Sequence, residues 1–260
     1  MGSNLALPFL LMLLNARSSG QRYQPVVPPG GWPTPPKQLS TPGHTQGERR
    51  TNPIDGTLFV WVPAGPFLFG PKNERRYTKG FWMARSVVTN RQFSMFCKAT
   101  GFIPFAERSG KAHKKMRLKR PVNTENFAET DVNYDVAVAY AKWARCAIPT
   151  EEMWEKAARG TDGRKYPWGN AVHKPSDRYM GSPPPEDEAS PYGCLGMVNC
   201  VAQWTSSGSL ARSHMSMGRY DQRLIPHQIV KGFSDCAQDD LVEARISPLY
   251  GFRLAVSVDQ

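Results

Sequence analysis

The sequence predicts an α+β fold in which small helices pack on twisted, mostly antiparallel strands with long irregular loops. The chain of 260 residues contains 22 glycines and 23 prolines, which favour turns over long helices. Its seven tryptophans and its hydrophobic content of 40% are sufficient for a packed core. Segments with strand periodicity precede and follow three short segments with helical periodicity, and no fixed-period repeat stands out.

Three regions are expected along the chain. Residues 1–19 form an apolar N-terminal segment, in which Leu5–Leu14 is too short to span a bilayer but has the length of a signal-peptide core. Residues 20–52 are rich in proline and are expected to be an extended linker. Residues 53–258 are expected to form the globular domain. Since the apolar segment has this length, we favour a secreted, periplasmic or surface-associated protein over a cytoplasmic one.

The basic charge of the chain is concentrated in two segments. The formal net charge is +11, of which residues 1–52 carry +4 and residues 108–120 carry +7. The second segment could bind a polyanion, although charge runs are more often solvated loops. Few aromatic residues alternate with these charges, so the sequence does not indicate a nucleic-acid platform.

The predicted domain opens with two strand-like segments. In Leu58–Val62, aliphatic residues alternate with aromatic ones, which is the pattern of a strand buried on both faces. Residues 63–65 favour a turn, and residues 67–69 favour a second strand. We therefore expect a β-hairpin.

Three short helices are expected after the hairpin, and none after Gly160. Thr89 has the position of an N-cap, and its helix ends at Gly101. A second helix spans residues 134–145. A third begins after Thr150, with two glutamates in its first turn, and ends at Gly160. The expected inward-facing residues are Phe93, Phe96 and Cys97, then Val136, Tyr140, Trp143 and Ala144, and finally Trp154 and Ala157.

Several sequence blocks resemble the formylglycine-generating enzyme, or sulfatase-modifying factor, family. The most specific is PTEEMWEKAARG followed by YPWGN, between Pro149 and Asn170. SPYGCLGMVNCVAQWT occupies the place of the family's YGLYDMAGNVWEWT, and GFRLAV resembles its terminal GFR segment. With WVPAGPFLFG near the start, these blocks span most of residues 53–258. The resemblance implies the family's variant of the C-type lectin-like fold.

The same blocks imply structural rather than chemical roles for their characteristic residues. Trp154 and Trp168 are expected to be buried in an aromatic brace, and Gly169 is expected to form a turn with positive φ. Gly251 permits close backbone approach in the final strand. The residues expected in structural roles are Trp154, Trp168, Gly169, Trp204, Gly251 and Arg253.

The copper site implied by the resemblance is incomplete. Family oxidases bind copper through two cysteines about five residues apart near the chain end, because soft thiolates suit Cu(I). Cys236 lies near the first position, but the second falls on Asp240 or Leu241. We therefore assign no catalytic residue, and Cys236 is the catalytic and metal candidate under the alternative that the protein is an oxidase.

The calcium site implied by the resemblance is also altered. The family's GNVWEW motif supplies an Asn, a Glu and backbone carbonyls, which are the oxygen donors that calcium requires. The segment here contains Asn199, Ala202 and Gln203, and loss of the carboxylate should weaken calcium binding. A related branch holds iron with three histidines, but none of the five histidines here pair at i, i+4. We expect no cofactor, and calcium at Asn199 and Gln203 and copper at Cys236 are the metals to test.

These departures favour a non-catalytic ligand-binding or display module. The resemblance extends to the variable proteins of diversity-generating retroelements, which share this fold and vary between the GNVWEW and GFR segments. Because this chain departs most from the family there, we expect its C-terminal loops to bind a protein or glycan ligand. The candidate residues are Ala202, Gln203, Arg212, His214, Arg219, Tyr220, Asp235, Gln238, Asp240 and Leu241. The alternative is a metal-dependent oxidoreductase, or a maturation factor, that acts on a peptide or protein thiol.

Overall fold

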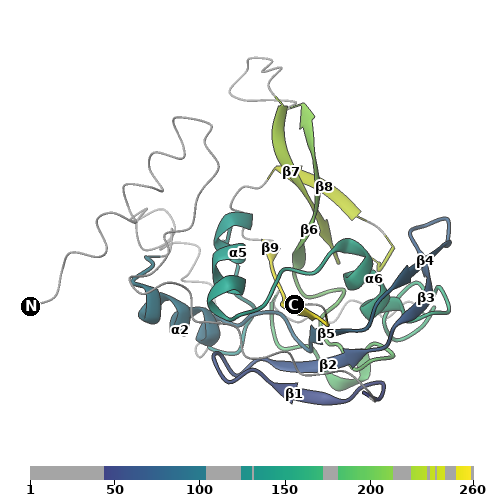
Figure 1. Cartoon of the computed structure of the whole chain (residues 1–260), viewed down its shortest axis with the longest axis horizontal. Coiled ribbons are helices and arrows are strands. Elements are labelled where there is room, and N and C mark those ends of the chain that lie inside the picture. Colours follow the sequence, from purple (N-terminus) through teal and green to yellow (C-terminus); the bar gives the residue numbers. More distant parts are fainter. Residues whose placement is uncertain are drawn as a thin grey trace, which may run out of the picture.

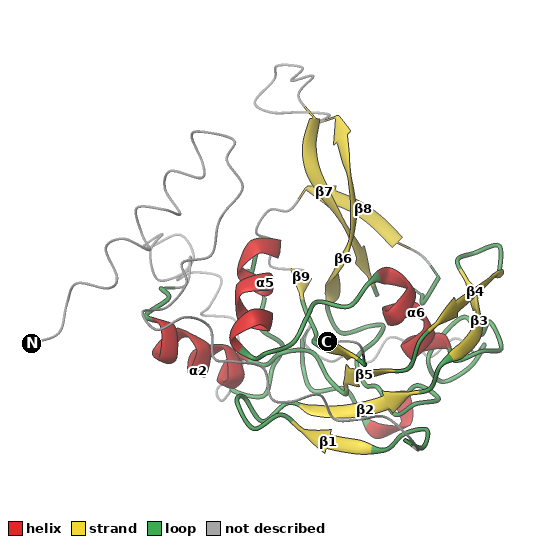
Figure 2. Cartoon of the chain, viewed as in Figure 1, coloured by secondary structure: helices red, strands yellow, loops and turns green. Residues whose placement is uncertain are grey.

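The computed structural model describes most of the expected domain. It covers residues 44–103, 124–130, 132–171, 181–212, 224–232, 235–237, 239–243 and 250–258. The apolar segment 1–19, the linker up to residue 43 and the basic segment 108–120 lie outside the described residues. Within those ranges, three α-helices and three sheets form the α+β fold that was expected, with mostly antiparallel strands (Figures 1 and 2).

The first sheet brings the two ends of the domain together. Its strands are β1 (Arg49–Thr51), β2 (Leu58–Val62), β5 (Phe81–Ala84) and β10 (Ala255–Ser257), in the order β1-β2-β5-β10 with antiparallel pairing throughout. β1 falls inside the region that the sequence assigned to the linker. His44 also contacts Trp61 and Trp82 in tilted and edge-on geometry, with ring centroids 4.7 and 4.9 Å away. The assignment of residues 44–52 to a linker was therefore wrong.

The second sheet corrects the predicted hairpin. β3 (Gly65–Phe69) pairs with β4 (Glu74–Thr78) and not with β2. Both edges of β2 are already paired, one with β1 and the other with β5. Because no hydrogen-bonding edge of β2 is left, the segment after the turn at residues 63–65 enters a separate sheet.

The third sheet carries the C-terminal part of the domain. It consists of β8 (Asp239–Glu243), β7 (Leu224–Lys231), β6 (Ala202–Arg212) and β9 (Tyr250–Gly251), in that order. The pairing is antiparallel except between β6 and β9. The outer halves of β6 and β7 project away from the rest of the domain (Figure 1).

The helices confirm the predicted caps. α2 (Asn90–Thr100) has a capping box between Thr89 and Gln92, and it ends at Gly101 in the left-handed region with φ 70°. α6 (Glu151–Arg159) is capped by Thr150. α5 (Tyr134–Trp143) ends two residues earlier than predicted, because Arg145 adopts a φ of 56° that no helix can contain. After Gly160, the only helical element among the described residues is a single 3-10 turn, η1 (Glu186–Glu188).

Two large hydrophobic clusters and a small one around Val87 and Val201 form the core of the described residues. One large cluster lies around α2 and α5, where Phe96 and Tyr140 contact each other and Tyr140 meets Phe252 at a centroid distance of 5.2 Å. The other large cluster lies around α6 and contains Trp154 and Cys236, both fully buried. No helix in the described part of the chain is long and apolar enough to cross a membrane.

Candidate functional site

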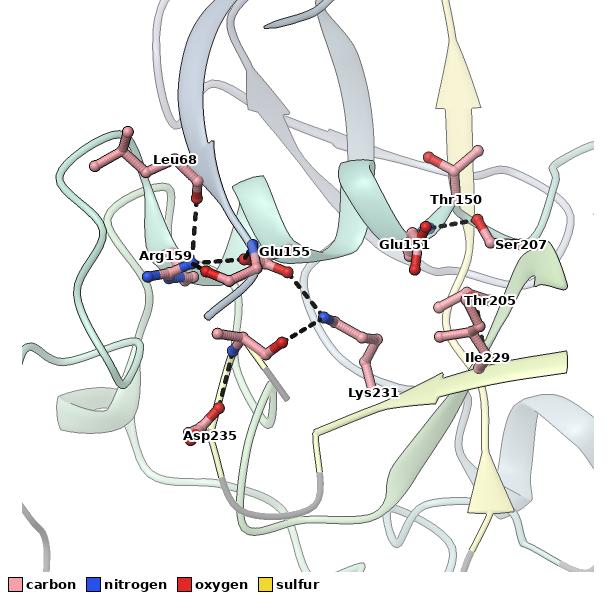
Figure 3. A network of polar contacts seen from close by, with 12 residues as sticks. Leu68, Thr150, Glu151, Glu155, Arg159, Thr205, Ser207, Ile229, Lys231 and Asp235 are labelled. Carbon is pink, nitrogen blue, oxygen red and sulfur yellow. Dashed lines mark hydrogen bonds and ion pairs between the residues drawn. The ribbon is translucent and has the colours of Figure 1, made fainter. Parts of the chain in front are cut away.

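A buried ionic network holds the base of the C-terminal sheet against α6. Lys231, near the end of β7, places its Nζ 2.8 Å from Oε2 of Glu155, and Arg159 Nη1 lies 2.6 Å from the other carboxylate oxygen (Figure 3). The side chains of Lys231 and Glu155 are 0% exposed. Removing one partner of such a group is costly, because the remaining charge stays buried without compensation.

The network also fixes the turn at residues 235–237, which carries the candidate Asp235. Lys231 Nζ donates a second hydrogen bond to Ala237 O at 3.3 Å, and Asp235 Oδ1 accepts from Ala237 N at 2.9 Å (Figure 3). The Cys236 N–H donates to Lys165 O at 3.1 Å. The turn is therefore tied both to β7 and to the loop after α6.

A second set of contacts fixes the start of β6 and its neighbour β7. The Glu151 N–H donates to Ser207 Oγ at 3.0 Å, and the Ser206 N–H donates to Pro149 O at 2.8 Å. The Thr205 hydroxyl donates to Ile229 O on β7 at 2.7 Å (Figure 3). The start of α6, through Glu151, and its middle, through Glu155, thus hold the sheet, while the outer strands extend beyond these contacts.

Ala202 and Gln203 do not face a ligand, contrary to the expectation from the sequence. They are 4% and 0% exposed, because β6 begins inside the domain with β7 on one side and β9 on the other. The Gln203 Oε1 accepts from Trp154 Nε1 at 2.8 Å and from Arg253 Nε at 2.5 Å. Its Nε2 donates to Gly196 O at 2.7 Å and to Val201 O at 3.2 Å. Gln203 is therefore a structural residue.

The other ligand candidates do not form one patch. Asp235 is half-buried at the base of the sheet, whereas Arg212 pairs with Leu224 at the far end of β6 and β7. A strand from residue 203 to residue 212 is about 30 Å long, so these two candidates lie at opposite ends of the sheet. Asp240 and Leu241 pair with Val230 and Ile229 on the middle strand, although their side chains lie outside the description. Four further candidates are outside the described residues: His214, Arg219, Tyr220 and Gln238.

The sequence alone missed the residues that organise this site. Glu155 and Arg159 stand four positions apart in the block PTEEMWEKAARG, which was the available signal for a pair on one helix face. Lys231 was not singled out, because its partner lies 76 residues away in the sequence. A buried lysine gives no local signal of this kind.

A family model matches residues 45–257 and describes a "Sulfatase-modifying factor enzyme 1-like domain". The chain belongs to this family. It is 28% identical to the formylglycine-generating enzyme of Mus musculus over 235 residues, which is 65% of this chain and 62% of that protein. It is 35% identical over 102 residues to the "Inactive C-alpha-formylglycine-generating enzyme 2" of Bos taurus, which is 31% of this chain and 33% of that protein. For the enzyme of Thermomonospora curvata the covered share is 52%, so the chain spans only about half to three-fifths of these enzymes.

Solved structures confirm the predicted fold. Treponema denticola variable protein 1 has a TM-score of 0.58 and 14% identity, covering 80% of this chain and 98% of that chain. PvdO from Pseudomonas aeruginosa has a TM-score of 0.59 and 18% identity, covering 83% of this chain and 100% of that chain. At such identities the likeness concerns the fold alone.

The described residues do not fit the copper ion that the family implies. Cys236 is fully buried in the cluster around Trp154, and burial raises the pKa of its thiol. A high pKa disfavours the thiolate that both a copper ligand and a nucleophile require. Among the described residues, no group of three or more His, Cys, Asp or Glu side chains is placed to hold a metal ion.

They do not fit calcium either. The Gln203 Nε2, an N–H donor, faces the carbonyl oxygens of Gly196 and Val201, where a cation would need a further oxygen. Asn199 is exposed and adopts a φ of 60°, a conformation that asparagine tolerates in tight turns. The Gln203 amide nitrogen therefore stands where a calcium ion would need an oxygen ligand.

The residues expected in structural roles lie in tightly packed or turn positions, with one exception. Trp154 and Trp204 are fully buried, and Gly169 has a φ of 132°. A Cβ on Gly251 would lie 2.9 Å from Glu129 O, so glycine is required by close approach. Trp168 is only half-buried, contrary to expectation.

Trp168 lies at the edge of the domain, where it stacks on Tyr166 with a centroid distance of 5.3 Å and an interplanar angle of 5°. Its Nε1 donates to Ala171 O at 2.9 Å. The ring therefore covers the Tyr166 side chain and packs against the margin of the core cluster around Trp154.

Arg253 is fully buried, and its guanidinium group donates to uncharged oxygens, namely the Gln203 amide and backbone carbonyls. Its Nη1 donates to Ala84 O at 3.0 Å, and its Nη2 donates to Leu195 O at 2.8 Å and to Gly196 O at 3.1 Å. Burial lowers the pKa of Arg253 to about 10, which still leaves the guanidinium charged at neutral pH. The segment between β9 and β10 is thereby fixed to β5 and to the loop before β6.

Proposed function

We propose that this family domain is a non-catalytic ligand-binding or display module whose binding surface is the outer part of β6, β7 and β8 with the loops that join them. The observation that carries the proposal is the contrast between the base and the outer part of this sheet. The base is locked to α6 by the Lys231–Glu155–Arg159 network, whereas the outer strands project from the domain (Figure 1). Such a scaffold can hold loops in place while their sequences differ.

Cys236 supports a binding role over the oxidoreductase alternative. A thiol that is 0% exposed can neither meet a peptide substrate nor exchange easily with copper in solution, and burial further disfavours its thiolate. It packs against apolar core residues such as Trp154 and Met197, close to the buried charges of Glu155, Arg159 and Lys231. These features suit a small packing residue.

The ligand chemistry that we propose is a protein or glycan surface. β8 is an edge strand of its sheet, so its outer backbone groups are a natural place for contact with a partner. Arg212 at the far end of β6 and Asp240 near the base of β8, opposite Val230, carry charges of opposite sign. A partner that contacts both would extend along most of the length of the sheet.

The proposal can be tested with a printed glycan array and a displayed peptide library. The parent is compared with Arg212→Ala/Asp240→Ala and with Arg75→Ala, a matched control on the exposed strand β4 of another sheet. We expect the double variant to lose at least about tenfold in affinity for the selected probes, which corresponds to about 1.4 kcal/mol, while Arg75→Ala binds like the parent. Equal binding by all three proteins would contradict the proposed surface.

A further inference from the structure

Three backbone carbonyls in the loop before β6 accept hydrogen bonds from two buried side chains, and Gly196 O is shared between them. Gly196 O and Val201 O both accept from Gln203 Nε2, at 2.7 and 3.2 Å. Leu195 O accepts from Arg253 Nη2 at 2.8 Å, and the same nitrogen lies 3.1 Å from Gly196 O. Carbonyl oxygens that point at one another repel unless a donor or a cation lies between them. In this chain the group between them is the amide nitrogen of Gln203, with the Arg253 guanidinium beside it.

The partners of Gln203 determine which way its amide points. Trp154 Nε1 and Arg253 Nε can only donate, so the atom that faces them must be the oxygen. Gly196 O and Val201 O can only accept, so the atom that faces them must be the NH₂. Reversing the amide would place donors against donors and oxygen against oxygen at all four contacts. Position 203 therefore requires an acceptor on one side and a donor on the other.

We propose that the Gln203 amide takes the place of a divalent cation in this loop, so that the loop folds without metal and position 203 decides its cation requirement. An ionised glutamate would keep the acceptor for Trp154 and Arg253. It would also bring a second carboxylate oxygen against two carbonyl oxygens with no proton between them. Calcium binds clusters of carboxylate and carbonyl oxygens, and it would separate the second carboxylate oxygen from the two carbonyl oxygens that the Arg253 guanidinium leaves without a donor between them.

The experiment compares the parent, Gln203→Glu and Gln203→Met in EDTA and in millimolar calcium at pH 8, where a glutamate is ionised. Melting temperature is one readout. The other is terbium luminescence sensitised by Trp154, whose indole nitrogen lies 2.8 Å from Oε1 of residue 203. Met has a similar length but neither a donor nor a charge, so it separates loss of the amide from gain of a carboxylate.

We expect the parent to melt at the same temperature with and without calcium and to give no saturable terbium signal. Gln203→Glu should melt at least about 5 °C lower in EDTA, recover most of that loss in calcium and bind terbium, because ligand binding stabilises the folded state. Gln203→Met should be destabilised equally in both buffers. Stoichiometric calcium in the parent would overturn the proposal. So would a Gln203→Glu protein that is as stable as the parent in EDTA, or one that stays unfolded in calcium.

Discussion

Lys231 on β7 and Glu155 on α6 form an ion pair that is 0% exposed on both sides, with 2.8 Å between Nζ and Oε2. The pair joins the C-terminal sheet to the helix that carries the family's most recognisable sequence block. Because Lys231 also donates to Ala237 O, the same ammonium group positions the turn that follows β7. The geometry of the proposed binding surface therefore depends on one buried charge cluster.

Breaking this pair should cost much more than breaking a surface pair on the same helix. We expect Lys231→Met to lower the free energy of unfolding by about 3–5 kcal/mol, because Glu155 keeps its charge with one cation fewer. Glu152→Gln is the matched control, since Glu152 on α6 is partly exposed and lies 3.6 Å from Arg76. It should change stability by less than about 0.5 kcal/mol. Urea unfolding measures both, and similar costs for the two variants would refute the role of the cluster.

Trp154 and Trp168, which belong to the block between Pro149 and Asn170, should differ in their contribution to stability. Trp154→Ala should cost about 3–5 kcal/mol, because the ring is fully buried and its Nε1 holds Gln203. Trp168→Ala should cost about 1–2 kcal/mol, because its half-buried ring covers only part of that apolar area. Denaturant titration of the two variants measures the difference. Equal losses would show that Trp168 packs more deeply than described.

Cys236 should matter for stability and not for turnover. Cys236→Ser buries a hydroxyl in an apolar cluster and should cost about 1–3 kcal/mol, whereas Cys236→Ala should cost less because it adds no polar group. Ligand binding by either folded variant should stay within about 1 kcal/mol of the parent. Oxygen uptake with a cysteine-containing peptide and added copper tests the alternative. We expect none from the parent, and uptake that disappears in Cys236→Ser would establish an oxidase.

The basic segment 108–120 should bind polyanions in a salt-dependent way. Its seven basic residues are unopposed by acids, so retention on immobilised heparin should fall steeply as salt rises. Replacing Lys114, Lys115 and Arg117 by Ser should abolish retention with little change in melting temperature. Equal elution of parent and variant at low salt would remove this segment from consideration.

The sequence by itself determined the parts of the fold that depend on neighbouring residues. The helix start at Thr89 and the stop at Gly101 follow from side-chain and backbone contacts within four positions, so their signals stand in the sequence. The family blocks likewise identified the fold, because they preserve the large buried side chains such as Trp154 and Trp204.

Only the tertiary structure decided how distant segments meet. β3 could not pair with β2, because β1 and β5 had already taken both of its edges, and no local pattern records that competition. Gln203 was expected at the surface, yet its partners Trp154 and Arg253 stand 49 and 50 residues away in opposite directions. A hydrogen-bonding side chain has the same sequence pattern whether water or the protein interior satisfies it. Burial, which depends on the whole chain, decides between the two.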